Sequence, residues 1–215
     1  DINYCFRNNA GGTAAVLFKK SSSGWTAVTM YNEISFTVGA VATPADGATL
    51  TQGGVTATVK RVVTQSGAWT GAATGRLIIT NPAGGNFAAG AATLTGGATC
   101  TLSAVQTAIT LSPSGRYEHV KENFGGSANA TRVYGCDGVN RGFEFDTSEI
   151  YVPIATGMAS DAPTHVVAHK KQLFYSFGGS VQHAAPGTPY IWSAVVGASE
   201  LAMGDTVTGF AGQPG

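Results

Sequence analysis

Runs of threonine, valine and alanine, separated by glycine, most strongly limit how this chain can fold. Glycine occupies 30 of the 215 positions, roughly twice its usual share, and it lacks the three-residue period of collagen. No window of about eleven residues keeps apolar side chains at helical spacing without a glycine or β-branched interruption. The pattern predicts an all-β chain of short antiparallel strands joined by tight turns.

Turn residues between branched runs place most of the predicted strands. Three hairpins share this design: Thr13–Lys19 with Trp25–Met30, Arg132–Gly135 with Gly142–Phe145, and Thr164–Ala168 with Gln172–Phe177. Further strands are predicted at Ile34–Val38, Tyr190–Val196 and Arg76–Thr80, the last as a buried central strand. Tyr117–Phe124 fits a strand or one helical turn, and Leu201–Gly209 is predicted as a turn that leads into a strand.

A charge-poor stretch predicts a second domain. Between about Gly39 and Leu111 the charged residues are Asp46, Lys60, Arg61 and Arg76. The flanking segments resemble each other and differ from this stretch. We therefore predict that residues 39–111 form a small β-sandwich or barrel inserted into a loop of a host β domain, residues 1–38 and 112–215. Short hairpins with regularly spaced turns indicate a sandwich or partial β-propeller for the host.

A weak internal repeat lies within the charge-poor stretch. Ala48–Val59 resembles Ala92–Leu102 when the two are aligned on their Gly-Gly pairs. Two copies would form two similar hairpins of one small sandwich or barrel. Sequence made mostly of alanine, threonine and glycine also produces chance matches easily, so both interpretations stand.

The number and balance of charged residues indicate which partners the chain can bind. Twelve basic and twelve acidic residues leave a formal net charge of zero, which argues against a surface dedicated to DNA or RNA. Charged residues make up only 11% of the chain, well below the roughly 25% of ordinary soluble domains. Either partner subunits cover much of the surface, or threonine, serine and asparagine supply its polarity.

The three cysteines, Cys5, Cys100 and Cys136, are too few and too scattered for a disulfide framework or a zinc site. We predict free thiols, which suit assembly in a reducing cytosol, and we expect no cofactor. No apolar run approaches the roughly 18 residues of a membrane span, and no signal peptide opens the chain. Asp1 and Gly215 both look like cut ends, which suggests the ordered part of a longer protein.

Acidic and histidine pairs are the candidates for catalysis or metal binding. Glu144 and Asp146 would share one face of a strand, close to Glu149, as a glycosidase pair requires. Two acids on the solvent face of a strand are, however, common. His165 and His169 would also share a face, but no adjacent glutamate completes a zinc-protease motif.

The remaining candidates lack the spacing that their chemistry needs. Asp137, Asn140 and Asp146 do not have the spacing of a calcium loop, and His119 and His183 stand alone. No nucleophile elbow, phosphate loop or dinucleotide fingerprint occurs. The basic pairs indicate loop and edge charges that discourage strand addition; they are Lys19-Lys20, Lys60-Arg61 and Lys170-Lys171. We predict that the chain is not an enzyme and binds no metal.

Two aromatic residues are the candidate contacts for a partner or a glycan. Trp69 lies between glycines in a predicted loop tip, and Tyr190 begins a predicted strand. Trp69 is either a partner anchor or a lid over its own small domain, and we favour the lid. Trp25 and Trp192 are far from Trp69 in the sequence.

The second half of the chain resembles a group of structural proteins of tailed bacteriophages. The motifs run in order through Arg132–Asp146, Ile154–Gly157, Asp161–Ser176, Gly187–Trp192 and Leu201–Gly209. The resemblance covers roughly residues 116–210, with weaker support from Ala15–Val28, and brings no catalytic residues. It implies a host domain of about two β-propeller-like blades, below the four or more of a full propeller. The 39–111 segment is similar to small β modules that phages insert into virion proteins.

The resemblance implies a structural subunit of the virion, in the tail or the head-to-tail region, that assembles in the cytoplasm of the host bacterium. Its partners would be copies of itself and other virion proteins, with no specific nucleic acid and no membrane span. The alternative is a module that binds a host-surface glycan through loop aromatics such as Trp69 and Tyr190. A third possibility, a glycoside hydrolase, would depend on Glu144 and Asp146.

Overall fold

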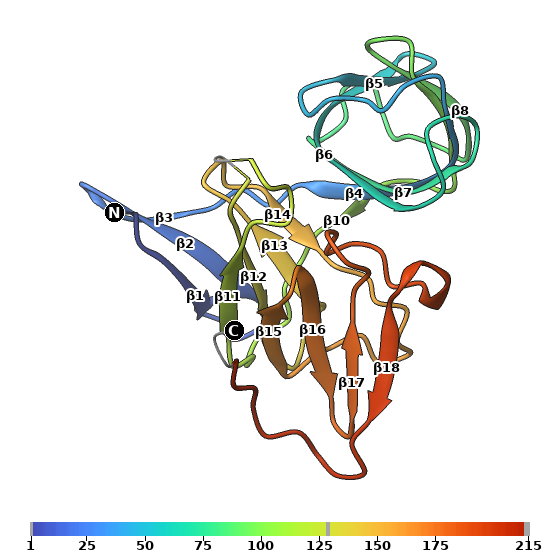
Figure 1. The fold of residues 1–215 in the computed structure, drawn as a ribbon. Coiled ribbons are helices and arrows are strands. Elements are labelled where there is room, and N and C mark those ends of the chain that lie inside the picture. Colours follow the sequence, from blue (N-terminus) through green and yellow to red (C-terminus); the bar gives the residue numbers. More distant parts are fainter. Residues whose placement is uncertain (1, 128–129, 213–215) are drawn as a thin grey trace. The chain divides into compact units, whose positions relative to one another are not determined.

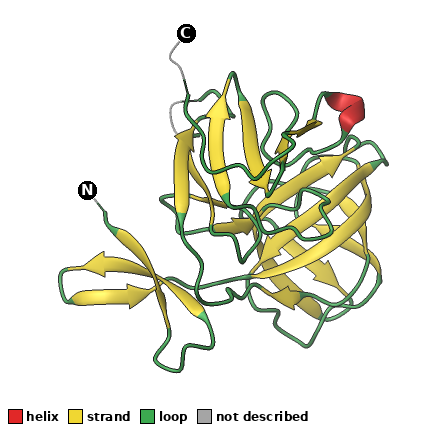
Figure 2. Ribbon diagram, turned by 90° about the horizontal axis from the view of Figure 1, so that it is seen from below, coloured by secondary structure: helices red, strands yellow, loops and turns green. Residues whose placement is uncertain are grey.

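The computed structural model describes residues 2–127 and 130–212, so the expected cut ends at Asp1 and Gly215 lie outside the described residues. Eighteen strands and a single 3-10 turn, η1 (Ala194–Val196), make up the regular structure of that part of the chain. Figure 2 shows the same content, strands throughout and one short helical turn. The all-β prediction is therefore confirmed.

The chain divides into two compact units: residues 1–29 with 110–215, and residues 30–109. We call them the host unit and the barrel unit, and describe each by itself. The barrel unit begins earlier than the charge-poor stretch that predicted it. It includes strand β4 (Asn32–Ala40), whose side chains Ile34 and Phe36 lie in the core of the barrel. Composition changes only after β4, so composition placed the boundary too late.

The barrel unit is a closed sheet. Its strands are β4, β5 (Thr49–Gln52), β6 (Val55–Ser66), β7 (Ala73–Ile79), β8 (Gly90–Leu94), β9 (Thr99–Leu102) and β10 (Thr107–Ala108). Pairing runs β4-β7-β6-β5-β8-β9, and a further pairing of β9 with β4 completes a six-stranded ring (Figure 1). The short strand β10 pairs with the start of β4. Closure removes the open edges that a sandwich would keep.

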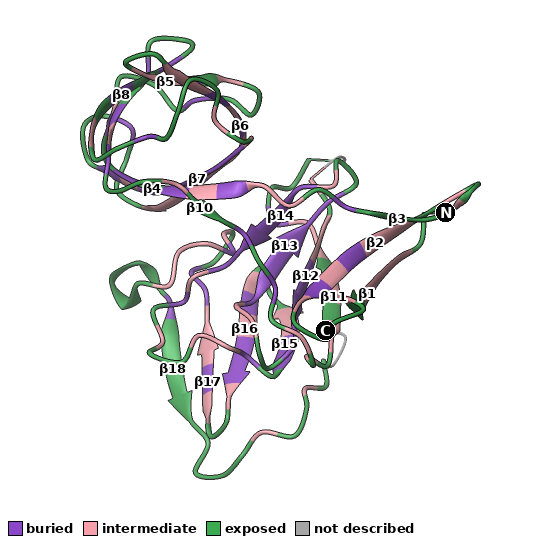
Figure 3. Ribbon diagram, turned by 180° about the vertical axis from the view of Figure 1, so that it is seen from behind, coloured by how far each residue is buried: buried purple, intermediate pink, exposed green. Residues whose placement is uncertain are grey.

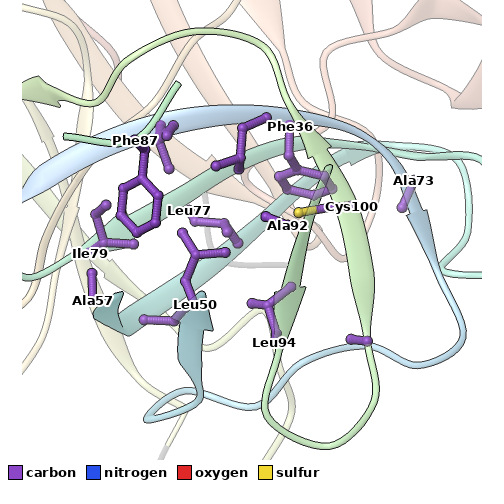
Figure 4. Packing of buried hydrophobic residues seen from close by; sticks show 14 of the residues in the cluster. Phe36, Leu50, Ala57, Ala73, Leu77, Ile79, Phe87, Ala92, Leu94 and Cys100 are labelled. Carbon is purple, nitrogen blue, oxygen red and sulfur yellow. The ribbon is translucent and has the colours of Figure 1, made fainter. Parts of the chain in front are cut away.

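Alternation along the strands fills the barrel with apolar side chains. Leu50, Val59, Leu77 and Ile79 are fully buried in one cluster, which Figure 4 shows at close range. The predicted central strand Arg76–Thr80 corresponds to β7, which pairs with both β4 and β6. The repeated segments form the hairpins β5–β6 and β8–β9, and β5 pairs with β8.

The host unit contains three antiparallel sheets, each with its strands in chain order. The first host sheet comprises β1 (Tyr4–Asn8), β2 (Ala15–Ser21) and β3 (Gly24–Ala27). The second comprises β11 (Glu118–Glu122), β12 (Arg132–Cys136), β13 (Phe143–Phe145) and β14 (Tyr151–Pro153). The third comprises β15 (His165–His169), β16 (Gln172–Phe177), β17 (Ser180–His183) and β18 (Ser199–Ala202). The three predicted hairpins correspond to β2–β3, β12–β13 and β15–β16.

Two predictions for the C-terminal part of the chain are wrong. For a third segment, Tyr117–Phe124, the structure decides between the two predicted alternatives. Tyr190–Val196 is a loop ending in η1 rather than a strand, because Pro189 precedes it and the Trp192 ring stacks on Tyr175. At Leu201–Gly209 the order is reversed: β18 ends at Ala202 and no strand follows within the described residues. Between the two alternatives for Tyr117–Phe124, the structure has a strand, β11.

The second host sheet lies between the other two. On one face, Phe6 of the first sheet stacks on Tyr117 at a ring-centroid distance of 3.7 Å, and Tyr4 meets Phe145 edge-on at 4.9 Å. On the opposite face, a shared cluster joins it to the third sheet; it contains Phe124, Tyr134, Cys136, Ile154, Val166, Leu173, Tyr175 and Ala184. The second sheet is therefore covered by apolar side chains on both faces.

The third strand position of the first host sheet is occupied by two separate segments. In the β2–β3 register Phe18 pairs with Ala27, so continuing it would place Met30 opposite Ala15. Leu111 pairs with Ala15 instead. Residues 30–110 thus leave and re-enter the sheet within one strand, with the register preserved.

Candidate functional site

The two acids proposed as a glycosidase pair are buried on one face of the second host sheet and bind neighbouring side chains. Glu144 and Asp146 are only 3% and 5% exposed. The Arg132 Nε lies 3.3 Å from Asp146 Oδ2 and 3.9 Å from Glu144 Oε1. The Tyr134 hydroxyl donates to Glu144 Oε2 at 3.0 Å. The third nearby acid, Glu149, is in an ion pair with Lys19. This arrangement neutralises a half-buried arginine and ties β12 to β13.

Asp137 and Asn140 come together, but in a turn. The Asp137 Oδ1 accepts hydrogen bonds from the backbone N–H groups of Val139 and Asn140, and its Oδ2 accepts one from the Asn140 side chain. Asn140 in turn bonds both the N–H and the carbonyl of Ser112. Asp146, the third proposed calcium ligand, belongs to the Arg132 network instead. These bonds are typical of a polar turn that fixes a neighbouring segment.

His165 and His183 bind different side chains and do not form a common site. His165 Nδ1 lies 3.0 Å from Glu118 Oε2, and Gln172 Nε2 lies 2.8 Å from His183 Nδ1. His169 shares the face of His165, as alternation along a strand predicts, but it is exposed at the end of β15. Among the described residues, no group of three or more histidine, cysteine, aspartate or glutamate side chains could hold a metal ion.

Trp69 lies inside the barrel unit. It is 6% exposed, its ring lies 4.9 Å from that of Phe36, and its Nε1 donates to Thr64 Oγ1 at 3.0 Å. A side chain at Gly39 would meet the indole at 2.9 Å, so glycine there makes room for the ring. In this position the indole closes the core of its own barrel.

Tyr190 is half-buried in the host unit. It packs against the cluster shared by the second and third host sheets, and its N–H donates to Thr188 Oγ1 at 3.3 Å. Trp192 packs against the same cluster, and its Nε1 donates to the Pro189 carbonyl at 3.0 Å. These aromatic residues hold the loop before η1 against the third sheet.

Burial suppresses the reactivity of two of the three cysteines. Cys100 lies in the barrel core and Cys136 in the host cluster, and desolvation raises the pKa of their thiols to about 11 and about 12. Glu118 and Asp137 add a smaller rise to the pKa of Cys136. Cys5 is half-buried. All three are free thiols in the structure.

The clearest candidate for an interaction site is the outer face of the first host sheet, turned away from the second sheet. Cross-strand pairing places Cys5 opposite Phe18, Arg7 opposite Val16, Phe18 opposite Ala27 and Lys20 opposite Trp25 on this face. We call this set the first outer face. Trp25 is 51% exposed, and the Lys20 ammonium lies 5.8 Å from its ring centroid.

The outer face of the third host sheet is the matching candidate. Pairing aligns Val167 with Phe174 and Phe174 with His183, and in the next row Val181 with Leu201. We call Val167, Phe174, His183 and Leu201 the third outer face. Leu201 is 48% exposed and Figure 3 shows β18 exposed along its length, whereas Val167, Phe174 and His183 are half-buried.

Sequence reasoning missed both outer faces. The available signal was β2, where Val16 and Phe18 alternate with Ala15 and Leu17, so that apolar side chains point to both sides of the strand. A strand with one solvated face normally alternates apolar with polar residues. Apolar residues on both sides indicate that both faces are to be covered.

The barrel unit carries a shallow groove of about 370 Å³ on its surface, lined by residues of β4, β5, β8 and β9. Threonine, alanine and glycine dominate its lining, and no charged side chain contributes to it. Val38 lies at the groove with a φ of 54°, unusual for a β-branched residue. The groove offers little chemistry for selecting a ligand.

Comparisons of this chain with protein-family models, with curated proteins and with solved structures find no match. Among the described residues, no helix is long and apolar enough to cross a bilayer.

Proposed function

We propose that the chain is a structural subunit of a tailed-phage virion, which assembles in several copies in the tail or the head-to-tail region. The observation that carries this proposal is the exposure of apolar side chains on the two outer sheet faces. A monomer in water gains nothing from a half-exposed tryptophan and leucine on such faces, whereas a subunit in an assembly buries them.

The sparse charge of the chain supports the same role. Only 11% of its residues are charged, so little repulsion opposes the approach of further subunits. Other large apolar side chains are also exposed, among them Val41 at 73% and Val195 at 94%. Exposed apolar surface of this kind marks interaction sites when it is contiguous.

The acids support a structural role over a hydrolytic one. Both carboxylates of the former candidate pair contact Arg132, and Tyr134 and backbone N–H groups bind them further. A glycosidase needs its acid and its nucleophile on either side of an accessible sugar. In the proposed role the work is mechanical: the host unit packs with its neighbours, and the barrel unit is an inserted module.

Mass spectrometry of purified particles tests this function. In a bacterial lysate that contains the polypeptide, we expect it to co-purify with tailed-phage particles through a density gradient, at a constant ratio to the major capsid protein. The control is a soluble host enzyme of similar mass, which should be lost at the gradient step. Exclusion of the polypeptide from the particles would contradict the proposal. Saturable binding of the free chain on a glycan array would favour the alternative function.

A further inference from the structure

In the host unit, each sheet packs face to face against the next, and we call such a packing interface a joint. Neighbouring sheets meet largely through first strands: β11 and β12 contact β15, and Phe6 of β1 stacks on Tyr117, the residue before β11, and lies 5.5 Å from the Phe143 ring of β13. In Figure 1 the strands β11 and β15 lie side by side, and the later strands of the second and third sheets fan away from them. The aromatic contacts of Tyr4 and Phe6 place the first sheet against the other face of the second sheet, so the three sheets are stacked face to face.

The first and the third sheet, at the two ends of the stack, each have one face that no further sheet covers among the described residues. The inner faces of the first and third sheets are covered by the second sheet, and their outer faces have no sheet against them among the described residues. The residues after β18 run along part of the third sheet: the Val207 N–H donates to the Gly178 carbonyl at 2.9 Å, and the ring centroids of Phe210 and His165 lie 6.4 Å apart. His165 and Val181 are buried, whereas Leu201, which pairs with Val181, is 48% exposed. The row of Val167 and Phe174 is also partly open.

Closure sets the number of copies. Face-to-face stacks of small antiparallel sheets close into rings of about four to eight sheets. The host unit supplies three sheets, which is too few. Two copies supply twice three, or six sheets, within that range, and three copies would supply nine, outside it. A closed ring built only from this chain therefore contains two copies.

Charge decides which faces meet. The first outer face carries Arg7 and Lys20, so pairing two first outer faces would bring four cations together. The outward positions of β15 to β18 alternate with the inward ones and hold no lysine or arginine. Pairing a first outer face with a third outer face therefore avoids like-charge repulsion. The same pairing covers Trp25 and Phe18 with the apolar row of Val167 and Phe174.

We propose that two copies of this chain associate head to tail, with the first outer face of each against the third outer face of the other, in a closed ring of six sheets. This inference rests on the proposed role as a self-assembling subunit, and names the surface and the stoichiometry. The joint is formed twice in each dimer and requires no other chain.

Sedimentation of the purified chain and three variants tests the ring. Wild type should sediment as a dimer at micromolar concentration. Trp25→Glu on the first outer face and Leu201→Glu on the third should each raise the dissociation constant at least about 30-fold, because each places a carboxylate in an apolar joint. The matched control is Val105→Glu, which changes a valine of the barrel unit that is 50% exposed and should leave the dimer intact.

Mixing the two variants tests the head-to-tail arrangement. A copy with Trp25→Glu and a copy with Leu201→Glu still share one joint in which both faces are wild type. The mixture should therefore form a heterodimer more readily than either variant forms a homodimer. Circular dichroism and melting temperature verify folding, and Trp25→Ser and Leu201→Ser replace any variant that fails to fold.

Three results would overturn the inference: a wild-type chain that stays monomeric at about 100 μM, an assembly of another stoichiometry, or a mixture that gains nothing over its components. None of these affects the particle experiment. A chain that is found in virions but is monomeric alone would keep the proposed function and remove the six-sheet ring. A dimer that is absent from virions would do the opposite.

Discussion

The acidic residues that the sequence offered as a catalytic pair form ion pairs and hydrogen bonds in the interior of the protein. Glu144 and Asp146 share a face of the second host sheet, as strand alternation predicts, but this face packs against the third sheet and not against solvent. Arg132 lies on the same face, one strand away. Buried charges persist in proteins only when they are paired and hydrogen-bonded, and this group meets both conditions.

The Arg132 network gives a stability prediction. Arg132→Met should lower the free energy of unfolding by about 3–5 kcal/mol, because two buried carboxylates lose their ion pairs with the Arg132 guanidinium. Arg116→Met is the control, since the Arg116 side chain is 85% exposed, and it should change stability by less than about 0.5 kcal/mol. Urea denaturation measures both. Equal effects of the two substitutions would show that the buried network is not what stabilises β12 and β13.

The cysteines give a second prediction at this scale. In the native chain at pH 8, Ellman's reagent should modify Cys5 first, while Cys100 and Cys136 react only after denaturation. Burial blocks access to both thiols and raises their pKa from 9.0 to about 11 and about 12, so at pH 8 both stay protonated. Peptide mapping after brief labelling identifies the modified residue. Rapid labelling of Cys100 in the native chain would mean that the barrel core opens readily.

At the scale of elements, the host sheets and the barrel follow different rules. Each host sheet is a meander, in which every strand pairs with its neighbour in the sequence. The barrel instead depends on the β4–β9 and β5–β8 pairings, which join strands far apart in the chain. Two bulges in the β6–β7 pairing and one in β4 bend the sheet toward closure. At one bulge an added methyl on Gly75 would overlap the Val63 carbonyl oxygen, so this turn of the sheet requires glycine.

The interrupted strand of the first host sheet predicts that residues 30–110 can be deleted without unfolding the host unit. Joining Thr29 directly to Leu111 keeps the side chain of Leu111 opposite Ala15, so the shortened chain should fold and unfold cooperatively. Residues 30–109 expressed alone should also fold, because β10 pairs with β4 and the Ile109 N–H donates to the Tyr31 carbonyl at 3.0 Å. Circular dichroism and thermal melting follow both fragments.

A one-residue shift provides the matched control. Joining Thr29 to Ser112 would point the following side chains to the opposite face of the sheet, and it removes Leu111, which is 5% exposed. This version should be less stable by about 2–5 kcal/mol. Two shortened chains of equal stability would contradict the continuous-strand interpretation.

At the scale of the whole host unit, ion pairs at the rim link the second and third sheets. Lys171 Nζ, in the β15–β16 turn, lies 2.9 Å from Glu122 Oε1 of β11. The hydrogen bond from Lys171 lowers the pKa of Glu122, and the backbone N–H of Asn123 contributes further. Partial burial of Glu122 opposes this shift but does not cancel it.

The lowered pKa fixes the direction of a pH effect. A carboxylate whose pKa is lower in the folded state stabilises the fold above its unfolded pKa, near 4.5, and loses this contribution as the pH falls through the folded value. Glu122→Gln should therefore be less stable than wild type at pH 7, and the difference should shrink as the pH falls below about 4.5. We expect less than about 1 kcal/mol, because the Lys171 side chain is 55% exposed. A difference that is unchanged at pH 3 would contradict this account.

The sequence by itself determined the fold class, the three hairpins and the existence of an inserted module. These features are local: two-residue alternation and glycine turns act between neighbours in the chain, and composition changes along it. Even so, Tyr190–Val196 has the apolar content of a strand and is a loop, because Trp192 packs on Tyr175, a contact with another part of the chain.

Only the tertiary structure decided which face of each strand is covered, that β9 closes the barrel on β4, and that Glu144 and Asp146 face inward. Alternation shows that two faces of a strand differ, but it does not show what packs against either. That depends on pairings between residues distant in the sequence, whose free energy comes from contacts that no short segment contains.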